Sequence, residues 1–129
     1  MSELNFKREI NANLDDAVER VTAALKEEGF GVLTRIDFHS KMKEKLGKDV
    51  QPTIILGACN PGLVYEAFLR NTDVTSLIPC NAVVREIAPG RVSIELAKPS
   101  FMMKMLGERE LENLATVADA KLNAALQRL

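Results

Sequence analysis

The chain of 129 residues is long enough for one folded domain and leaves no room for a second hydrophobic core. Hydrophobic residues make up 47% of it and charged residues 27%, a balance typical of folded proteins that excludes a disordered chain. The net charge of −1 argues against a dedicated nucleic-acid-binding protein, because such proteins carry an excess of basic residues.

The first third of the sequence predicts a strand, a helix and a second strand. Near-alternation of apolar residues indicates a strand over 3–10, and apolar residues at three- and four-residue steps indicate an amphipathic helix over 13–28. Asn13 suits the N-cap of that helix, and Gly29 suits the left-handed position that ends it. A second strand is predicted over 30–38, with alternate residues on one face. These are Phe30, Val32, Thr34, Ile36 and Phe38.

The middle of the chain predicts two helices separated by a strand. A short helix bearing lysines is expected over 40–46, and an apolar strand over 53–58. The strand leads into Asn60, a plausible N-cap, and a helix over 61–70 that begins with proline. We expect that helix to bury Leu63, Val64, Ala67 and Phe68.

The last third predicts a hairpin and a long helix. Residues 71–78 form a connection, and strands over 80–87 and 91–96 are joined by a turn that contains Pro89 and Gly90. An apolar, methionine-rich segment over 101–106 precedes a helix over 108–127, whose long apolar stripe must cover one face of a sheet. The order of elements is therefore β-α-β-α-β-α-β-β-α.

Three segments resemble, in order and spacing, the signature segments of the domain-of-unknown-function 302 family. They are Lys26–Leu33, Leu56–Pro61 and Leu77–Val84, and the similarity extends over roughly residues 4–99. The resemblance implies one α+β domain over 1–129 with a TATA-binding-protein-like fold. In that fold a curved antiparallel sheet of about five strands carries a long C-terminal helix and an N-terminal helix on one face (β-α-β4-α, with inserted short helices). It also implies a homodimer, but the family has no established activity and no catalytic residue to carry over.

The most suggestive chemical feature is the repeated Cys-Asn pair, Cys59-Asn60 and Cys80-Asn81. Both pairs fall at predicted strand ends, where the four side chains would line a cleft and bind a small ligand. Cys59 also precedes a helix, whose dipole would lower the pKa of the thiol and make it nucleophilic or metal-binding. The alternative is that both cysteines are small buried hydrophobes and that the asparagines are helix caps.

A metal site is short of ligands. Tetrahedral zinc takes four protein ligands, or three and a water, whereas the sequence offers Cys59, Cys80 and the single histidine, His39. The methionines of the 101–106 segment would suit a soft metal, although filling core gaps beneath the last helix is the simpler role for Met102, Met103 and Met105. We therefore predict no metal ligand, and the sequence leaves open which cofactor, if any, the protein uses.

The remaining polar candidates have ordinary explanations. His39 has no partner in sequence, so a solvated histidine is the simpler interpretation than a general base. One basic cluster would suit an anionic ligand, but a solvated helix face is the simpler explanation. The cluster comprises Arg35, Lys41, Lys43, Lys45 and Lys48.

Three functions remain open. The favoured one is a small-ligand-binding module, because a long helix laid over a curved sheet leaves a cleft at one end. The second is thiol-based redox or metal chemistry, and the third a homodimeric interaction domain without catalysis. For the third, the 80–87 strand is apolar on both faces, with Val83 and Ile87 opposite Ala82 and Val84. No acid–base pair can be assembled, so whether the protein is an enzyme is undecided.

The expected location is the cytoplasm, without membrane association. The first ten residues are too charged for a signal peptide, and no stretch approaches the ~20 apolar residues that cross a bilayer. In that compartment Cys59 and Cys80 are expected to be reduced.

Overall fold

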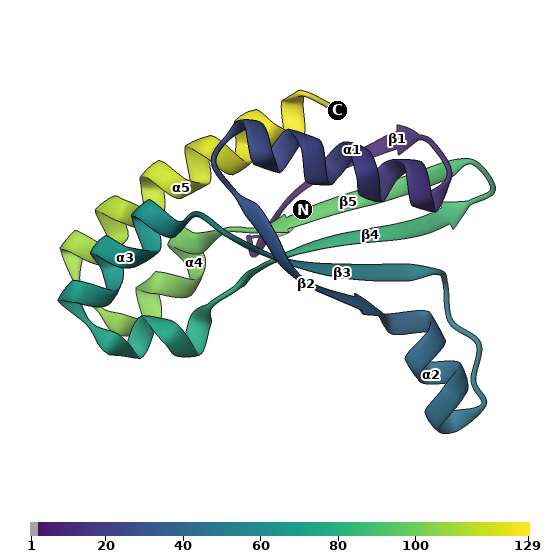
Figure 1. Ribbon diagram of the computed structural model, residues 1–129, viewed down its shortest axis with the longest axis horizontal. Coiled ribbons are helices and arrows are strands. Elements are labelled where there is room, and N and C mark those ends of the chain that lie inside the picture. The colour runs from purple at the N-terminus through teal and green to yellow at the C-terminus, as the bar shows by residue number, and fades with distance from the viewer. Residues whose placement is uncertain (1–2) are drawn as a thin grey trace.

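The computed structural model describes residues 3–129 and shows one antiparallel sheet with helices packed on it (Figure 1). The sheet has five strands in the order β1-β5-β4-β3-β2. They are β1 (Asn5–Asn11), β2 (Gly31–Asp37), β3 (Thr53–Cys59), β4 (Cys80–Ala88) and β5 (Arg91–Ala97). The predicted α+β class and the antiparallel sheet are confirmed.

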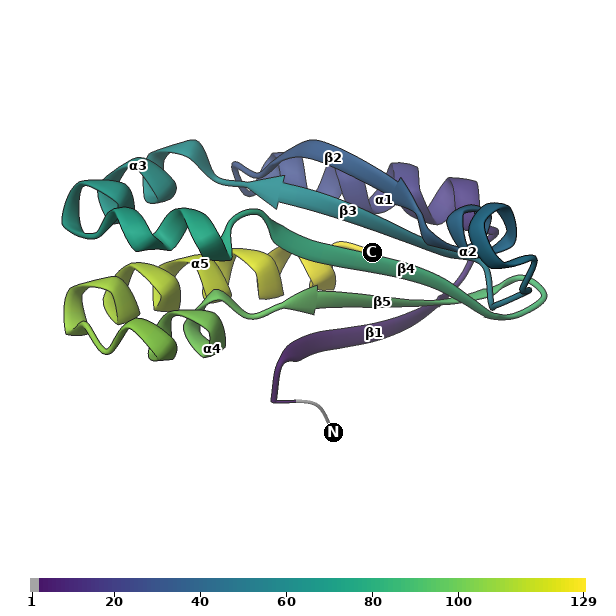
Figure 2. The ribbon, with the colours of Figure 1, turned by 90° about the horizontal axis from the view of Figure 1, so that it is seen from below.

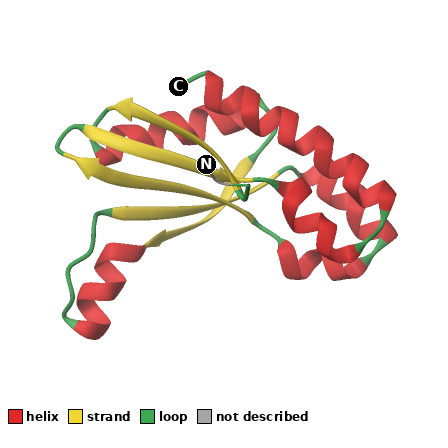
Figure 3. Cartoon of the chain, turned by 180° about the vertical axis from the view of Figure 1, so that it is seen from behind, coloured by secondary structure: helices red, strands yellow, loops and turns green. Residues whose placement is uncertain are grey.

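Two long helices lie on one face of the sheet (Figure 3). They are α1 (Leu14–Glu27) and α5 (Arg109–Gln127), and each turns an apolar stripe inward as the sequence pattern predicts. Asn13 caps α1 by accepting a hydrogen bond from the backbone N–H of Asp16 at 2.8 Å. The shorter elements are α2 (Phe38–Leu46), α3 (Pro61–Arg70), α4 (Pro99–Met103) and the 3-10 segments η1 (Thr72–Leu77) and η2 (Lys104–Leu106).

The buried apolar residues form two clusters, and α5 contributes to both. The larger cluster lies between the sheet, α1 and the C-terminal half of α5. The smaller one lies beyond the end of the sheet, where α3, η1, α4 and the N-terminal half of α5 gather (Figure 2). Its buried members are Ala67, Val74, Met103, Leu111 and Ala115. The boundary between the clusters runs past the ends of β3 and β4, where the sequence places its two Cys-Asn pairs.

The opposite face of the sheet is open in Figure 2, and α2 extends away from the sheet on that side (Figures 1 and 3). Ser93 points to this face as predicted, yet it is buried, and its hydroxyl has no hydrogen-bond partner among residues 3–129. The reason is that its neighbours on the same face are long side chains that form two ion pairs, Arg85–Glu95 and Arg91–Glu9.

Three expectations about side-chain placement are wrong. The alternation predicted for the second strand is interrupted, because a β-bulge between Val32 and Thr34 places them on opposite faces. In α3 only Ala67 is buried, and Phe68 is 42% exposed, because that helix packs through one narrow edge. Of the methionines, Met103 fills the smaller cluster as expected, but Met105 is exposed on η2.

In the part of the chain that the structure describes, the longest helices are amphipathic, and none is long and apolar enough to cross a membrane.

Candidate functional site

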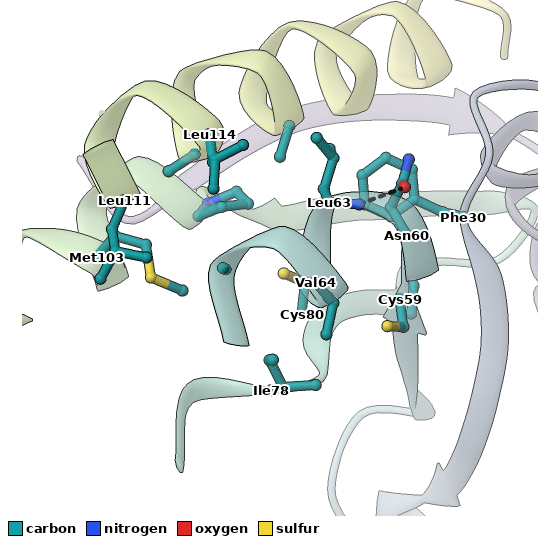
Figure 4. Close-up of a pocket in the computed structure, with 15 residues that line it drawn as sticks. Phe30, Cys59, Asn60, Leu63, Val64, Ile78, Cys80, Met103, Leu111 and Leu114 are labelled. Carbon is teal, nitrogen blue, oxygen red and sulfur yellow. Dashed lines mark hydrogen bonds between the residues drawn. The ribbon is translucent and has the colours of Figure 1, made fainter. Parts of the chain in front are cut away.

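An apolar cavity lies at the boundary between the two hydrophobic clusters (Figure 4). It holds about 50 Å³, or about 500 Å³ when the space open to solvent is included. Five of the six signature-segment residues that line it are apolar or thiol side chains, and the rest of its wall comes from α3, α4 and α5. The lining residues are Phe30, Ala58, Cys59, Asn60, Leu63, Val64, Ala67, Ile78, Cys80, Pro99, Met103, Leu111, Leu114, Ala115 and Ala118. Three of the four predicted site residues, Cys59, Asn60 and Cys80, are therefore on this wall.

The fourth predicted residue lies elsewhere. Asn81 is exposed and does not line the cavity. It pairs with Gly57 across β3 and β4, which directs it to the open face of the sheet. Side chains alternate along a strand, so Cys80 and Asn81 point to opposite faces, and Asn81 points away from the cavity.

Asn60 has a structural role at the junction of three elements. Its side-chain oxygen accepts a hydrogen bond from the backbone N–H of Leu63 at 3.3 Å, which caps α3. Its amide nitrogen donates to the backbone carbonyl of Glu28 at 3.4 Å, which holds the end of α1. Gly29 lies beside that nitrogen with φ +85°, a backbone conformation that favours glycine. The amide of Asn60 is thus already engaged on both sides.

The three segments that carry the family resemblance meet at this place. Glu28 and Gly29 contact Asn60. Cys59 pairs with Gly31 of β2, and Ala58 pairs with Cys80 of β4. On the open face, Pro79 packs against Gly57, where a side chain would not fit. The spacing of the two Cys-Asn pairs is therefore explained by packing between neighbouring strands.

The surroundings of both thiols favour the protonated form. Burial raises the pKa of Cys59. Burial, with smaller contributions from Cys59 and Asp119, raises the pKa of Cys80 to about 11. At Cys59 the pKa shift is therefore opposite to the lowering expected from a helix N-terminus, and neither thiol has the depressed pKa of an activated nucleophile. The cysteines are not joined by a disulfide.

The other chemical candidates lie away from the cavity. His39, on α2, accepts a hydrogen bond at Nδ1 from the backbone N–H of Thr53 at 3.0 Å, which ties that helix to the start of β3. The cluster around Arg35 and the α2 lysines is exposed at the same end. Within residues 3–129, no three His, Cys, Asp or Glu side chains gather closely enough to hold a metal ion.

Most of the cavity wall was not identified as a site from the sequence. The sequence predicts Phe30, Leu63 and Leu111 as core residues of separate elements, and Met103 as a filler of core gaps. All four line the cavity. Nothing in their local patterns distinguishes a wall residue from a core residue, because both are apolar and at helical or strand spacing. The only local signal was the position of the Cys-Asn pairs at strand ends.

Replacing Asn60 by alanine is expected to lower the free energy of unfolding by about 1–2 kcal/mol. The reason is that α3 loses its N-cap and the carbonyl of Glu28, at the end of α1, loses its hydrogen bond from Asn60. Asn60→Ser restores a capping oxygen but not the donor to Glu28, so it is expected to recover about half of the loss. Equilibrium urea denaturation measures both changes. Equal losses for the alanine and serine variants would contradict a capping role.

Comparisons with known proteins agree with this arrangement. Residues 6–129 match the family described as "Domain of unknown function DUF302". The chain is also similar to the crystal structure of an uncharacterized conserved protein DUF302 from Bacillus stearothermophilus, with 30% sequence identity, 98% of each chain covered and a TM-score of 0.90. No curated protein matches the chain. The TATA-binding-protein-like label is named by neither match and stays a prediction.

Proposed function

The chain belongs to the family of domains of unknown function DUF302, and on that premise we propose that it is a small-ligand-binding module whose site is the apolar cavity. The observation that carries this proposal is that the three resemblance-bearing segments converge on the wall of one cavity. Clefts between separately packed parts of a protein are common ligand sites. The role proposed for Cys59, Asn60 and Cys80 is to shape and line the site.

Binding is favoured over thiol catalysis by the state of the two cysteines. A catalytic or redox-active thiol is normally ionised near neutral pH, through a helix N-terminus or a neighbouring cation. Cys59 and Cys80 both have raised pKa values, and the groups that shift Cys80 further, Cys59 and Asp119, act in the same direction. The two free thiols are also what a protein of the reducing cytoplasm would carry, and we propose that location.

Native mass spectrometry tests the proposal on protein purified under reducing conditions without a metal-binding tag. We expect additional mass that survives desalting, and we expect Ala118→Val, which places two methyl groups in the cavity wall, to lose it. Ala120→Val is the matched control, because Ala120 is exposed on the same helix. If the bare chain alone is observed, and a small-molecule extract of the expression host causes no chemical-shift change in the methyl groups of Leu63 or Leu111, the proposal is wrong.

A homodimer is a second candidate, and the open face of the sheet favours it. Ile36 is 46% exposed on that face, and Ile55 and Val83 lie half-buried beside it. A second copy of the chain would cover these side chains. Light scattering at micromolar concentration tests this, with Ile36→Lys expected to yield monomer and Leu69→Lys, at an exposed position on α3, expected to leave the dimer intact. A wild-type monomer would contradict it.

A further inference from the structure

We propose that the cavity takes the end of an unbranched hydrocarbon chain, an inference that rests on the ligand-binding function proposed above. Three features support it: the chemistry of the cavity wall, the volume of the cavity, and the apolar side chains exposed on the helices that wall the cavity.

The wall offers no partner for a charge. All the residues that line the cavity are uncharged. The one amide among them, Asn60, already accepts a hydrogen bond from Leu63 and donates one to Glu28. The nearby carboxylate of Asp119 accepts hydrogen bonds from the backbone N–H and the hydroxyl of Ser100. A charged group inside the cavity would therefore have no opposite charge, and a hydroxyl would have at most the remaining N–H and lone pair of Asn60 in place of its hydrogen bonds to water.

The inner space fits a chain better than a ring. Its volume of about 50 Å³ is well below the roughly 150 Å³ of an apolar cavity known to hold benzene. It exceeds the roughly 10–15 Å³ that a cavity needs, on the same measure, to hold one water molecule, so a methyl group and its neighbouring methylene fit. All the space between the lining atoms, open solvent included, amounts to about 500 Å³, so the following part of the chain can extend outward.

The helices that wall the cavity also expose apolar side chains to solvent. On α3, Tyr65 and Leu69 are 64% and 66% exposed, and on η2, directly after α4, Met105 is 67% exposed. Phe68 and Phe101 on the same helices are also exposed. The part of a hydrocarbon chain that extends beyond the cavity would therefore lie among helices that expose apolar side chains. A polar ligand would not need such an apolar surface around the site.

A matched pair of probes tests the proposal on the wild-type protein. The probes are 1-octanol and 1,8-octanediol, which differ only by a hydroxyl at the far end of the chain. We expect 1-octanol to shift the methyl resonances of Leu63, Val64, Ile78, Leu111 and Leu114, which line the cavity. The diol should bind at least about tenfold more weakly, because its second hydroxyl would be buried with fewer hydrogen bonds than it makes to water. Octanoate and octanedioate make the same comparison with carboxylates in place of the terminal hydroxyls.

Two variants of α5 test whether 1-octanol binds in the cavity. Ala118→Val is expected to abolish the 1-octanol shifts, whereas Ala120→Val, which has the same cost in helix propensity, leaves them unchanged. The comparison of the two probes on the wild type does not depend on either variant folding. Equal affinity for 1-octanol and the diol, or no methyl shift with 1-octanol, would overturn the inference.

Two further outcomes separate this inference from the function on which it rests. If native mass spectrometry finds a polar compound that Ala118→Val loses, while 1-octanol does not bind, the ligand-binding function stands and the hydrocarbon assignment falls. If 1-octanol binds as expected, phosphatidylcholine vesicles then identify the source of the chain. The same methyl shifts with vesicles alone would indicate a membrane lipid, and their absence a free chain-bearing molecule.

Discussion

Replacing Gly57 by alanine is expected to lower the free energy of unfolding by about 3 kcal/mol, the largest effect of any single methyl group added to this sheet. A Cβ atom at this position would lie 2.6 Å from Cγ of Pro79 and would overlap Oγ1 of Thr34 on the other side. Gly57 sits in the middle of β3, hydrogen-bonded between β2 and β4, so β3 cannot shift away from Pro79 without disturbing the ladder, and rotation of Thr34 relieves only one of the two overlaps. Equilibrium urea denaturation measures the loss.

The chain contains its own control for this experiment. Gly31→Ala places the same methyl group on the adjacent strand, where nothing lies within 4 Å, and it is expected to change the free energy of unfolding by less than about 0.5 kcal/mol. Adding Thr34→Ala to Gly57→Ala removes one of the two overlaps and should recover part of the loss, because Pro79 still obstructs the position. Similar stabilities for the Gly57 and Gly31 variants would show that the contact of β3 with Pro79 does not constrain the strand.

The secondary structure was predictable because its signals are local. Asn13 and Gly29 bound α1, and Asn60 and Pro61 begin α3, through hydrogen bonds and backbone angles that involve only a few neighbouring residues. The hairpin of β4 and β5 follows in the same way from alternation and the turn at Gly90. These features do not depend on where the rest of the chain goes.

The errors arise where a side chain depends on distant neighbours. The bulge in β2 shifts the strand by one residue because Gly57 pairs with Thr34, a relation absent from the alternation of β2 itself. Phe68 has the correct helical spacing for burial, but α3 packs on η1 and α5 through a narrow edge, which leaves it exposed. Ser93 has the polar character of an exposed position and is buried by ion pairs from two adjacent strands.

The cavity could not be predicted for the same reason. Its wall draws on the start of β2, the ends of β3 and β4, and on α3, α4 and α5, so it exists only when these elements are in place. The sequence did indicate the location, because Cys59 and Cys80 fall at strand ends that prove to be adjacent. It did not indicate that Asn81 points to the opposite face, which follows from the register of β4.

The thiol of Cys80 is expected to react with iodoacetamide at pH 8 about 100-fold more slowly in the folded protein than in urea. Only the thiolate reacts, and raising the pKa from 9.0 to about 11 lowers the thiolate fraction by the corresponding factor. A Cys59→Ser variant isolates the reaction of Cys80; it removes the smaller contribution of Cys59 and keeps the larger one, burial. Folded and unfolded rates within about threefold of each other would contradict the raised pKa and restore thiol chemistry as a leading function.

The same raised pKa predicts a loss of stability in alkali. Below pH 9 the thiol of Cys80 is protonated in both the folded and the unfolded chain, so its full contribution to stability is present. Between pH 9 and 11 the unfolded chain loses the proton first, and the free energy of unfolding falls by a total of about 2–3 kcal/mol. Cys80→Ala lacks this group, so the difference in unfolding free energy between wild type and variant should shrink as the pH rises from 8 to 11. A difference that is independent of pH over that range would mean that Cys80 ionises as a solvated thiol does, and the cavity wall could then not be as dry as a hydrocarbon ligand requires.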